Sequence, residues 1–288
     1  QFDDVKFDAN NSLIEIIEQE FDNEFIKLCL STGLNKEIIS RKENKIVFTA
    51  LHGTSSVIMP GLLKKAGYLN AKFEKSQMLP DGNFSTVKSP NPEEIESMDL
   101  ALKLANLENA EMVIGTDPDA DRLAIVDNHG KPIGEESTLV LALESYLKYY
   151  QGSQKVVTNL STSMAVDVIA HQYNSTVERS SVGEINVVEK MKELESTIGG
   201  EGNGGVILEE SHLGRDSLVA SALILNHLAQ SDIPFDKILE STPRFTMIKD
   251  KITLQHDVDF NHIKSLFKNN DISFIECCLL YTSDAADE

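Results

Sequence analysis

The sequence has 288 residues, of which 41% are hydrophobic and 25% charged, enough for two folded domains with cores of their own. Its formal net charge of −20 excludes broad nucleic-acid binding, which needs a basic surface. No apolar run reaches the ~18 residues that a membrane-spanning helix needs, so we expect no membrane partner. The negative charge also means that an anionic substrate must be bound by local cations, backbone amides or a metal ion.

The N-terminus has neither the basic start nor the apolar stretch of a signal peptide, and it begins abruptly, as a piece of a longer protein would. Cys29, Cys277 and Cys278 match neither a disulfide framework nor a metal-ligand spacing. Both observations favour a cytoplasmic location. The sequence leaves the oligomeric state open.

Residues 1–42 predict a helical lead-in whose apolar side chains are spaced for one helix face. We expect this face to pack against the domain that follows or to bridge to a further part of a longer protein. Its apolar residues are Leu13, Ile17, Phe21, Phe25 and Leu28.

Residues 43–132 predict a first α/β domain. The apolar run at 45–50 (KIVFTA) is typical of a buried strand, and the helix after it is expected to end at Gly67. Two further apolar runs, at 112–114 and 123–126, predict strands on either side of a short acidic loop.

A loop rich in proline, asparagine and serine is expected at residues 79–92. At its end, Asn91 stands where an N-cap is expected, Pro92 at the first helical position and Glu94 at the third. This pattern predicts a helix that begins at Pro92.

Residues 133–245 predict a second α/β domain, with the boundary near residues 130–134. Short β-like runs again alternate with amphipathic helical runs. Two rounds of alternation predict an α/β fold class, with two consecutive α/β/α domains and mixed, largely parallel sheets. Helices are expected near residues 137–149, 164–171, 185–193 and 216–228, and strands near residues 156–158, 177 and 198.

Asp117, Asp119 and Asp121 alternate along the acidic loop. Carboxylates at i, i+2 and i+4 of an extended backbone can converge on one hard cation, and Pro118 restrains the turn. Arg122 follows at once and offers a cation that can bind a phosphoryl group through two hydrogen bonds. Because phosphoryl transfer needs a metal ion and a fixed cation, the loop predicts a Mg²⁺ site with Arg122 as a catalytic residue.

Other interpretations of the acidic loop have to be weighed. An acidic surface turn is the commonest fate of three aspartates, although solvated turns rarely lie between two buried strands. A calcium-binding EF-hand would need glycine at Arg122 and glutamate at Asn128, so that interpretation fails. The Asp-x-Asp-x-Thr pattern of an aspartyl phosphatase is broken by Asp121.

Five glycines lie among residues 199–205, directly after an expected strand. Glycine lets the backbone approach a ligand closely, while Glu201 and Asn203 offer a carboxylate acceptor and an amide. A merely flexible loop is the alternative, but an isolated polar pair in this setting is better suited to binding sugar hydroxyls. Further along, Asp216 is expected to cap the next helix.

The acidic loop (GTDPDADRL, residues 115–123) resembles the metal-binding loop of the α-D-phosphohexomutases, which include phosphoglucomutase, phosphomannomutase and phosphoglucosamine mutase. The first half of the chain resembles the phosphoglucomutase and phosphomannomutase branch, and the second half is more similar to phosphoglucosamine mutase. A natural intermediate and two joined genes would both explain this mixture. The other motifs that carry the resemblance are TALHGT (49–54), DGNF (81–84), SPNPEE (89–94), GEESTLV (134–140) and the glycine loop.

The resemblance implies domains II and III of a phosphohexomutase at residues 43–132 and 133–245. It implies an isomerase that moves a phosphoryl group between the 1- and 6-positions of a hexose phosphate through a bisphosphate. Phosphoglucosamine mutase is the alternative within the family. From another class, the alternative is a non-enzymatic acidic module whose loop holds a divalent cation or nothing.

The resemblance also assigns roles to individual residues. The three aspartates would hold the Mg²⁺ cofactor, and Glu201 and Asn203 would select the hydroxyl arrangement of the sugar. Arg179 and Arg215 lie in strings that resemble phosphoglucosamine mutases (RSSVGE, residues 179–184, and HLGRDS, residues 212–217) and would contact the substrate.

In the family, a phosphoserine in the first domain donates the phosphoryl group and a loop of the fourth domain binds phosphate. No serine motif of the Thr-Ala-Ser-His-Asn-Pro type occurs in the sequence, so we expect a fragment that is inactive alone. Residues 246–277 would then start the linker to the fourth domain. Residues 278–288 resemble translated sequencing adapter and are expected to be a non-native tail.

Overall fold

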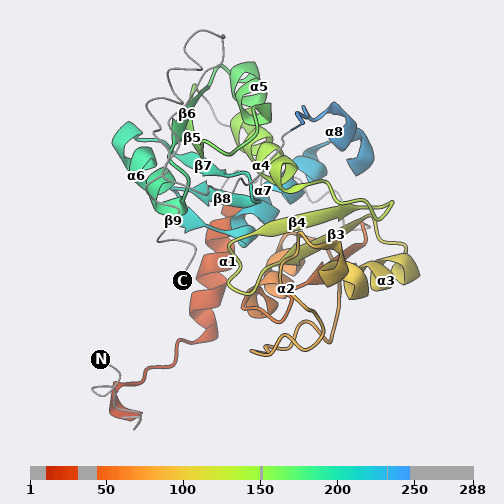
Figure 1. Ribbon diagram of the computed structural model, residues 1–288. Coiled ribbons are helices and arrows are strands. Elements are labelled where there is room, and N and C mark those ends of the chain that lie inside the picture. Colours follow the sequence, from red (N-terminus) through yellow and green to blue (C-terminus); the bar gives the residue numbers. More distant parts are fainter. Residues whose placement is uncertain (1–10, 32–43, 150–151, 232, 247–288) are drawn as a thin grey trace, which may run out of the picture.

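Two mixed β-sheets, each covered by helices, make up the part of the chain that the computed structural model describes (Figure 1). The described residues are 11–31, 44–149, 152–231 and 233–246. The expected linker beyond residue 246 and the expected tail at 278–288 lie outside them. Among the described helices, none is long and apolar enough to cross a membrane.

The first sheet has the strand order β2-β1-β3-β4. The first three strands are parallel, and β4 pairs antiparallel with β3. Helix α2 packs on the face that carries Phe48, and α3 packs on the face that carries Val47. Because β1 and β3 are buried on both faces, their sequences are continuous apolar runs. The elements are β1 (Ile46–Thr49), α2 (Ser55–Lys65), β2 (Lys72–Phe73), α3 (Asp99–Glu108), β3 (Met112–Thr116) and β4 (Leu123–Asp127).

The second sheet has the strand order β6-β5-β7-β8-β9. Strands β6, β5 and β7 are parallel, and β8 and β9 extend the sheet antiparallel. Helix α6 covers one face, while α4, α5 and α7 pack on the other. The first elements are α4 (Glu135–Tyr149), β5 (Lys155–Asn159), α5 (Ala165–Gln172), β6 (Thr176–Ser180) and α6 (Glu184–Leu194). They are followed by β7 (Ile198–Glu201), β8 (Gly205–Leu208), β9 (His212–Arg215), α7 (Ser217–Gln230) and α8 (Phe235–Ser241). The predicted fold class is therefore confirmed.

One hydrophobic core runs through both α/β units. Phe48 and Leu62 of the first unit belong to the same buried cluster as Leu139 and Leu223 of the second. Polar contacts join the units as well, because the Tyr68 hydroxyl donates to the carbonyl of Leu225 at 2.9 Å. The two sheets are thus held in a defined relative position, which matters for loops that meet between them.

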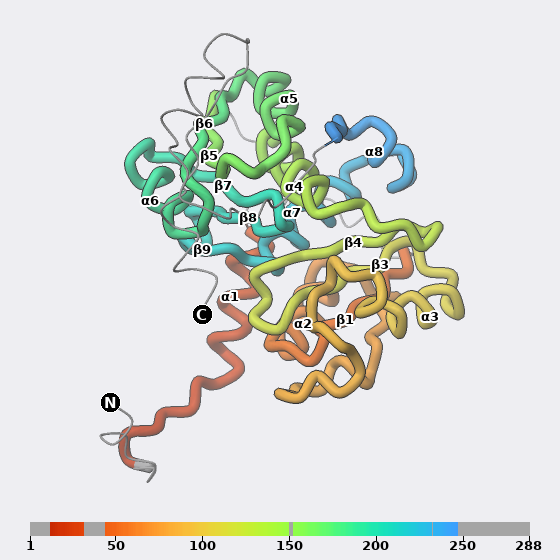
Figure 2. Tube along the Cα trace, viewed as in Figure 1, coloured from red at the N-terminus to blue at the C-terminus, as the bar shows by residue number. Residues whose placement is uncertain are grey.

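The N-terminal helix differs from the prediction in its bounds and in its buried face. Helix α1 (Gln19–Ser31) packs against α2 and α7 and so runs along both units (Figures 1 and 2). Leu13 and Ile17 precede the helix and are 81% and 70% exposed. Ile26 and Cys29 are buried where the helix packs against α2 and α7, and Phe25 of the predicted face packs partly buried against the same core.

The helix expected to begin at Pro92 begins later. Asn91 Oδ1 does accept a hydrogen bond from the Glu93 amide at 3.1 Å, but the chain continues as turns and a 3₁₀ helix, η3 (Ile95–Met98), before α3. Tertiary contacts hold this stretch, because the Ser97 hydroxyl donates to the carbonyl of Ser89 at 2.6 Å. A local capping pattern was therefore overridden by contacts to the preceding loop.

Asp216 caps α7 as predicted. Its Oδ1 accepts hydrogen bonds from the amides of Leu218 at 2.7 Å and Val219 at 3.1 Å, and its Oδ2 lies 2.9 Å from His212 Nε2. We expect Asp216→Ala to lower the free energy of unfolding by about 1–2 kcal/mol, because two helix amides lose their acceptor. Asp216→Asn keeps an acceptor and should lower the free energy of unfolding by only a few tenths of a kcal/mol. Urea unfolding of both variants checks this, and equal losses would assign the effect to the His212 contact instead.

Candidate metal and sugar site

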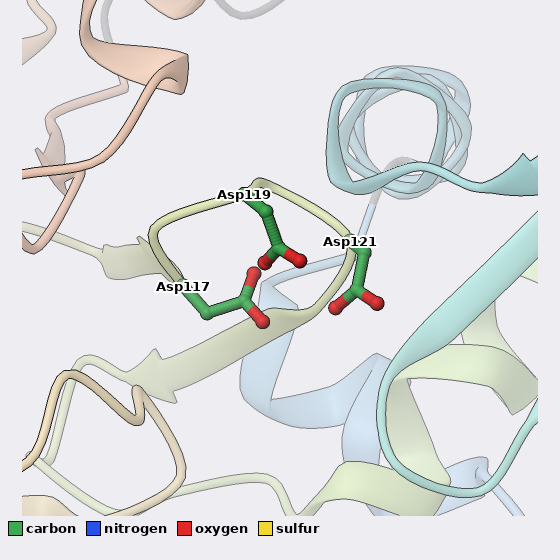
Figure 3. A group of neighbouring side chains, drawn as sticks. All are labelled: Asp117, Asp119 and Asp121. Atoms are coloured by element: carbon green, nitrogen blue, oxygen red, sulfur yellow. The ribbon is translucent and has the colours of Figure 1, made fainter. Parts of the chain in front are cut away.

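The three predicted metal ligands lie on the loop that joins β3 to β4. The antiparallel pairing of Thr116 with Leu123 closes this loop at its base. Ala120 has a left-handed backbone conformation with φ of 63°, which turns the chain back on itself. In Figure 3 the carboxylates of Asp117 and Asp119 are turned toward each other inside the loop, with the Asp121 carboxylate beside them.

The geometry and burial of the aspartates fit a hard cation. One carboxylate oxygen from each of Asp117, Asp119 and Asp121 lies within 4.8 Å of the others. Asp121 Oδ1 is buried and has no hydrogen-bond partner among the described residues. Desolvation, together with the neighbouring Asp121 and Asp119 carboxylates, raises the pKa of Asp117 to about 7. Three crowded carboxylates, one with a buried oxygen that accepts no hydrogen bond, are a donor set that Mg²⁺ would satisfy.

Arg122 is the first cation of the site. Its backbone amide donates to Asp117 Oδ1 at 3.0 Å. Its Nε lies 3.7 Å from Asp117 Oδ2 and 3.6 Å from Asp121 Oδ1, and its side chain is 37% exposed. Arg122 therefore partly balances the carboxylates, while part of its side chain stays exposed to solvent.

The predicted sugar loop is the hairpin between β7 and β8. Glu201 is 4% exposed and accepts hydrogen bonds from Asn159 Nδ2 at 2.6 Å and from the Gly183 amide at 3.2 Å. Asn203 is half-buried at the tip, where its Oδ1 accepts from the Gly205 amide at 3.3 Å. The Glu201 carboxylate is thus held in place from several sides.

The sugar loop abuts the metal loop. Gly204 has a φ of +83°, and a Cβ atom added there would lie 2.6 Å from the carbonyl oxygen of Leu123, the residue after Arg122. In addition, the amide of Ser217 donates to the carbonyl of Ala120 at 2.9 Å. The two loops that the sequence singled out separately therefore touch through their backbones.

Arg215 joins the two loops through its side chain. Its guanidinium forms an ion pair with Asp121 Oδ2 through Nη2 and with Glu201 Oε2 at 3.1 Å through Nη1. Its Nε lies 3.1 Å from Glu184 Oε2, and its backbone amide donates to Glu184 Oε1 at 2.9 Å. Sequence reasoning had placed Arg215 at the site but missed Glu184 as its partner, because a first-turn glutamate of a helix is also an ordinary surface residue.

Arg179 lies behind the sugar loop and contacts neither the aspartates nor Glu201 in the described structure. Its Nη1 donates to the carbonyls of Thr162 at 2.7 Å and Asn159 at 3.2 Å, and its Nη2 pairs with Asp167. The Thr162 hydroxyl in turn accepts from the Gly202 amide at 3.0 Å. Arg179 therefore braces the loop after β5, on which the sugar loop rests.

His52, in the TALHGT string, contacts the loop after β2. Its Nδ1 lies 2.9 Å from the carbonyl oxygen of Leu79, and its Nε2 lies 2.8 Å from the Thr86 hydroxyl. Both ring nitrogens are thus engaged in holding the loop after β2.

Comparisons with known proteins agree with this arrangement. The family model described as phosphoglucomutase/phosphomannomutase, alpha/beta/alpha domain II, matches residues 23–130. The model for domain III of the same family matches residues 134–245. The predicted family resemblance is thereby confirmed.

Similar curated proteins carry phosphohexomutase names. A phosphoglucomutase/phosphomannomutase of Thermococcus kodakarensis is 28% identical over 247 residues, which are 86% of this chain and 53% of that protein. A Pyrococcus horikoshii protein named "Probable phosphoglucosamine mutase" is 27% identical over 223 residues, 77% of this chain and 48% of that protein. The chain thus spans about half the length of these relatives.

Solved structures show the same fold. A phosphoglucomutase/phosphomannomutase family protein of Burkholderia thailandensis superposes with a TM-score of 0.64 at 21% identity, over 77% of this chain and 46% of that one. Two consecutive domain models of one family cover most of the sequence. The chain therefore belongs to the phosphoglucomutase/phosphomannomutase family of phosphohexomutases.

Proposed function

We propose that this chain supplies the metal loop and the sugar loop of a mutase that moves a phosphoryl group between the 1- and 6-positions of a hexose phosphate, through a bisphosphate. The observation that carries the proposal is the meeting of the two loops, with Arg215 paired to both Asp121 and Glu201. A phosphoryl group bound near the aspartates and a sugar bound near Glu201 would then belong to one small molecule. Membership of the family supports the reaction class.

Each residue has a role in this proposal. Asp117, Asp119 and Asp121 would hold Mg²⁺, which supplies positive charge that stabilises the transferring phosphoryl group. Arg122, whose side chain is partly exposed, would bind the phosphoryl oxygens through its guanidinium. Glu201 accepts a hydrogen bond from a sugar hydroxyl, and Asn203 at the tip of the loop offers its amide to another.

The proposed substrate is either a glucose or mannose phosphate or a glucosamine phosphate. Both are kept because similar proteins are named phosphoglucomutase/phosphomannomutase and probable phosphoglucosamine mutase. We also propose that the 288 residues alone do not turn over substrate, since no serine motif of the family type occurs among them. Isomerisation of glucose 1-phosphate by the purified chain would contradict this. Activity of the complete gene product on the three substrates would decide between them.

A non-enzymatic acidic module is the competing class, and Mg²⁺ titration separates it from the mutase proposal. We expect calorimetry to show one Mg²⁺ bound per chain and Asp119→Ala to weaken binding roughly tenfold or more, because one of three carboxylate ligands is lost. Asp99→Ala, at the exposed start of α3, removes the same charge from the same unit and should bind Mg²⁺ like the wild type.

Two outcomes of the Mg²⁺ titration would contradict a specific metal site. If the wild type takes up no Mg²⁺, or if Asp119→Ala and Asp99→Ala behave alike, the aspartates form a solvated acidic turn. The chain would then keep the family fold without the metal-dependent chemistry.

A further inference from the structure

Arg215 is placed unusually for a residue expected to contact substrate. Its side chain is 13% exposed, and three of its nitrogens face carboxylates from three different segments. Asp121 lies on the metal loop, Glu201 on the sugar loop and Glu184 at the start of α6. The guanidinium therefore contacts a carboxylate of the metal loop and a carboxylate of the sugar loop while it is itself largely buried.

The two oxygens of Asp121 have different surroundings. Oδ2 is paired with Arg215. Oδ1 lies on the side of Asp117, because Arg122 Nε is 3.6 Å from it and 3.7 Å from Asp117 Oδ2. Oδ1 is also the buried oxygen that has no hydrogen-bond partner in the described part of the chain. Because the ion pair with Arg215 engages Oδ2, Oδ1 is the oxygen of Asp121 that is left to bind a metal ion.

We propose that Arg215 is a positioning residue that orients Asp121 for Mg²⁺ and links the metal loop to Glu201 of the sugar loop. The proposal rests on the Mg²⁺ site of the proposed function. Carboxylates that bind a metal are commonly held by hydrogen bonds from outer residues, and loss of such a residue typically weakens metal binding ~10–100-fold. Here the outer residue also holds the sugar loop, so the two subsites share one anchor.

The fork shape of the guanidinium is essential to this role. Arginine presents several N–H donors in a fixed plane, whereas lysine presents one ammonium on a flexible chain. A lysine at position 215 keeps the positive charge. It cannot pair with Asp121, Glu201 and Glu184 at the same time, so it cannot fix their relative positions. Geometry and charge can therefore be separated by comparing lysine with glutamine at this position.

The test is Mg²⁺ calorimetry on the full 288-residue chain. We expect Arg215→Lys to weaken Mg²⁺ binding about 10–100-fold, because Asp121 loses its orientation while the local charge is unchanged. If Arg215 instead only competed with the metal for Asp121, Arg215→Lys would bind as the wild type does and Arg215→Gln would bind more tightly. Either of these results would overturn the proposal.

Controls separate folding and charge from positioning. Lys237→Gln removes a cation of the same unit that pairs with Glu240 in its own helix, so Mg²⁺ binding should not change. Should Arg215 variants fail to fold, Glu184→Gln provides a second test, because the 35% exposed Glu184 side chain anchors Arg215 from the far side. Glu184→Gln should weaken Mg²⁺ binding severalfold, although position 184 does not contact the aspartates, and unchanged binding would overturn the proposal.

The link to the sugar loop has its own measurement. Hydrogen exchange of the amides at residues 201–205 should slow when Mg²⁺ is added to the wild type and should not respond in Arg215→Lys. Equal responses in both proteins would overturn the link. If the wild type binds no Mg²⁺, the proposed function and this inference are both contradicted. If the wild type binds Mg²⁺ and Asp119→Ala does not, the metal site of the proposed function stands, and the Arg215 variants alone test this inference.

Discussion

Gly204→Ala is expected to lower the free energy of unfolding by about 3 kcal/mol. Part of the loss is the cost of a side chain in a left-handed conformation, about 1–2 kcal/mol at a φ of +83°. The rest is overpacking, about 1–3 kcal/mol, because the new Cβ would lie 2.6 Å from the backbone carbonyl oxygen of Leu123. The metal loop cannot withdraw freely, since the carbonyl of Ala120 accepts a hydrogen bond from the amide of Ser217 at the start of α7.

Gly130→Ala is the matched control for this prediction. Gly130 has a similar φ of +74°, but no atom lies within 4 Å of an added Cβ. It should therefore show the backbone cost alone, about 1–2 kcal/mol. Urea unfolding of both variants measures the difference. Equal destabilisation would mean that the contact between the sugar loop and the metal-loop strand does not hold the two units together.

Acidification from pH 7.5 to pH 4 is expected to remove about 2–3 kcal/mol of folding stability through His227. This histidine lies on α7, which packs against α4; it is 6% exposed, and its Nε2 lies 3.8 Å from Glu144 Oε2 of α4. Desolvation, with a smaller effect of Lys148, lowers the pKa of His227 from 6.5 to about 4. The unfolded chain therefore binds the proton first, so the stability contribution is present above pH 6.5 and is lost as pH falls toward 4.

The variant that tests this is His227→Gln, compared with the wild type by urea unfolding at several pH values. Glu144 contributes with the opposite sign, because burial raises its pKa and favours folding at low pH. Since both proteins keep Glu144, their difference isolates His227. We expect the wild type to lose the extra stability between pH 6.5 and pH 4, and parallel curves would show that His227 can be protonated without cost.

Local sequence patterns predicted the strands because a strand that is buried on both faces of its sheet consists of consecutive apolar residues. Strands β1 and β3 are continuous apolar runs, and the Asp216 cap precedes an apolar helix. The acidic loop was recognisable as a candidate metal site because all three aspartates and Arg122 lie within six consecutive residues. Where every interacting group is local, spacing alone defines the geometry.

Patterns failed where distant segments compete with local preference. The capping pattern at Asn91 did not start a helix, because contacts of Ser97 hold the segment in turns. The apolar spacing predicted that Leu13 and Ile17 pack with Phe25, but only Phe25 packs against the core, beside the buried Ile26 and Cys29, because the helix contacts α2 and α7 at its C-terminal half. In each case the sequence offers several local solutions and packing chooses among them.

By itself, the sequence determined the α/β fold class, and it predicted a Mg²⁺ site in the acidic loop and a sugar site in the glycine loop. Only the tertiary structure decided that these loops touch and that Arg215 joins them. Arg215 and Asp121 are separated by 94 positions, and no periodicity or spacing relates residues that far apart. Their meeting follows from the shared core between the two sheets, which sets the relative position of loops that neither domain could place alone.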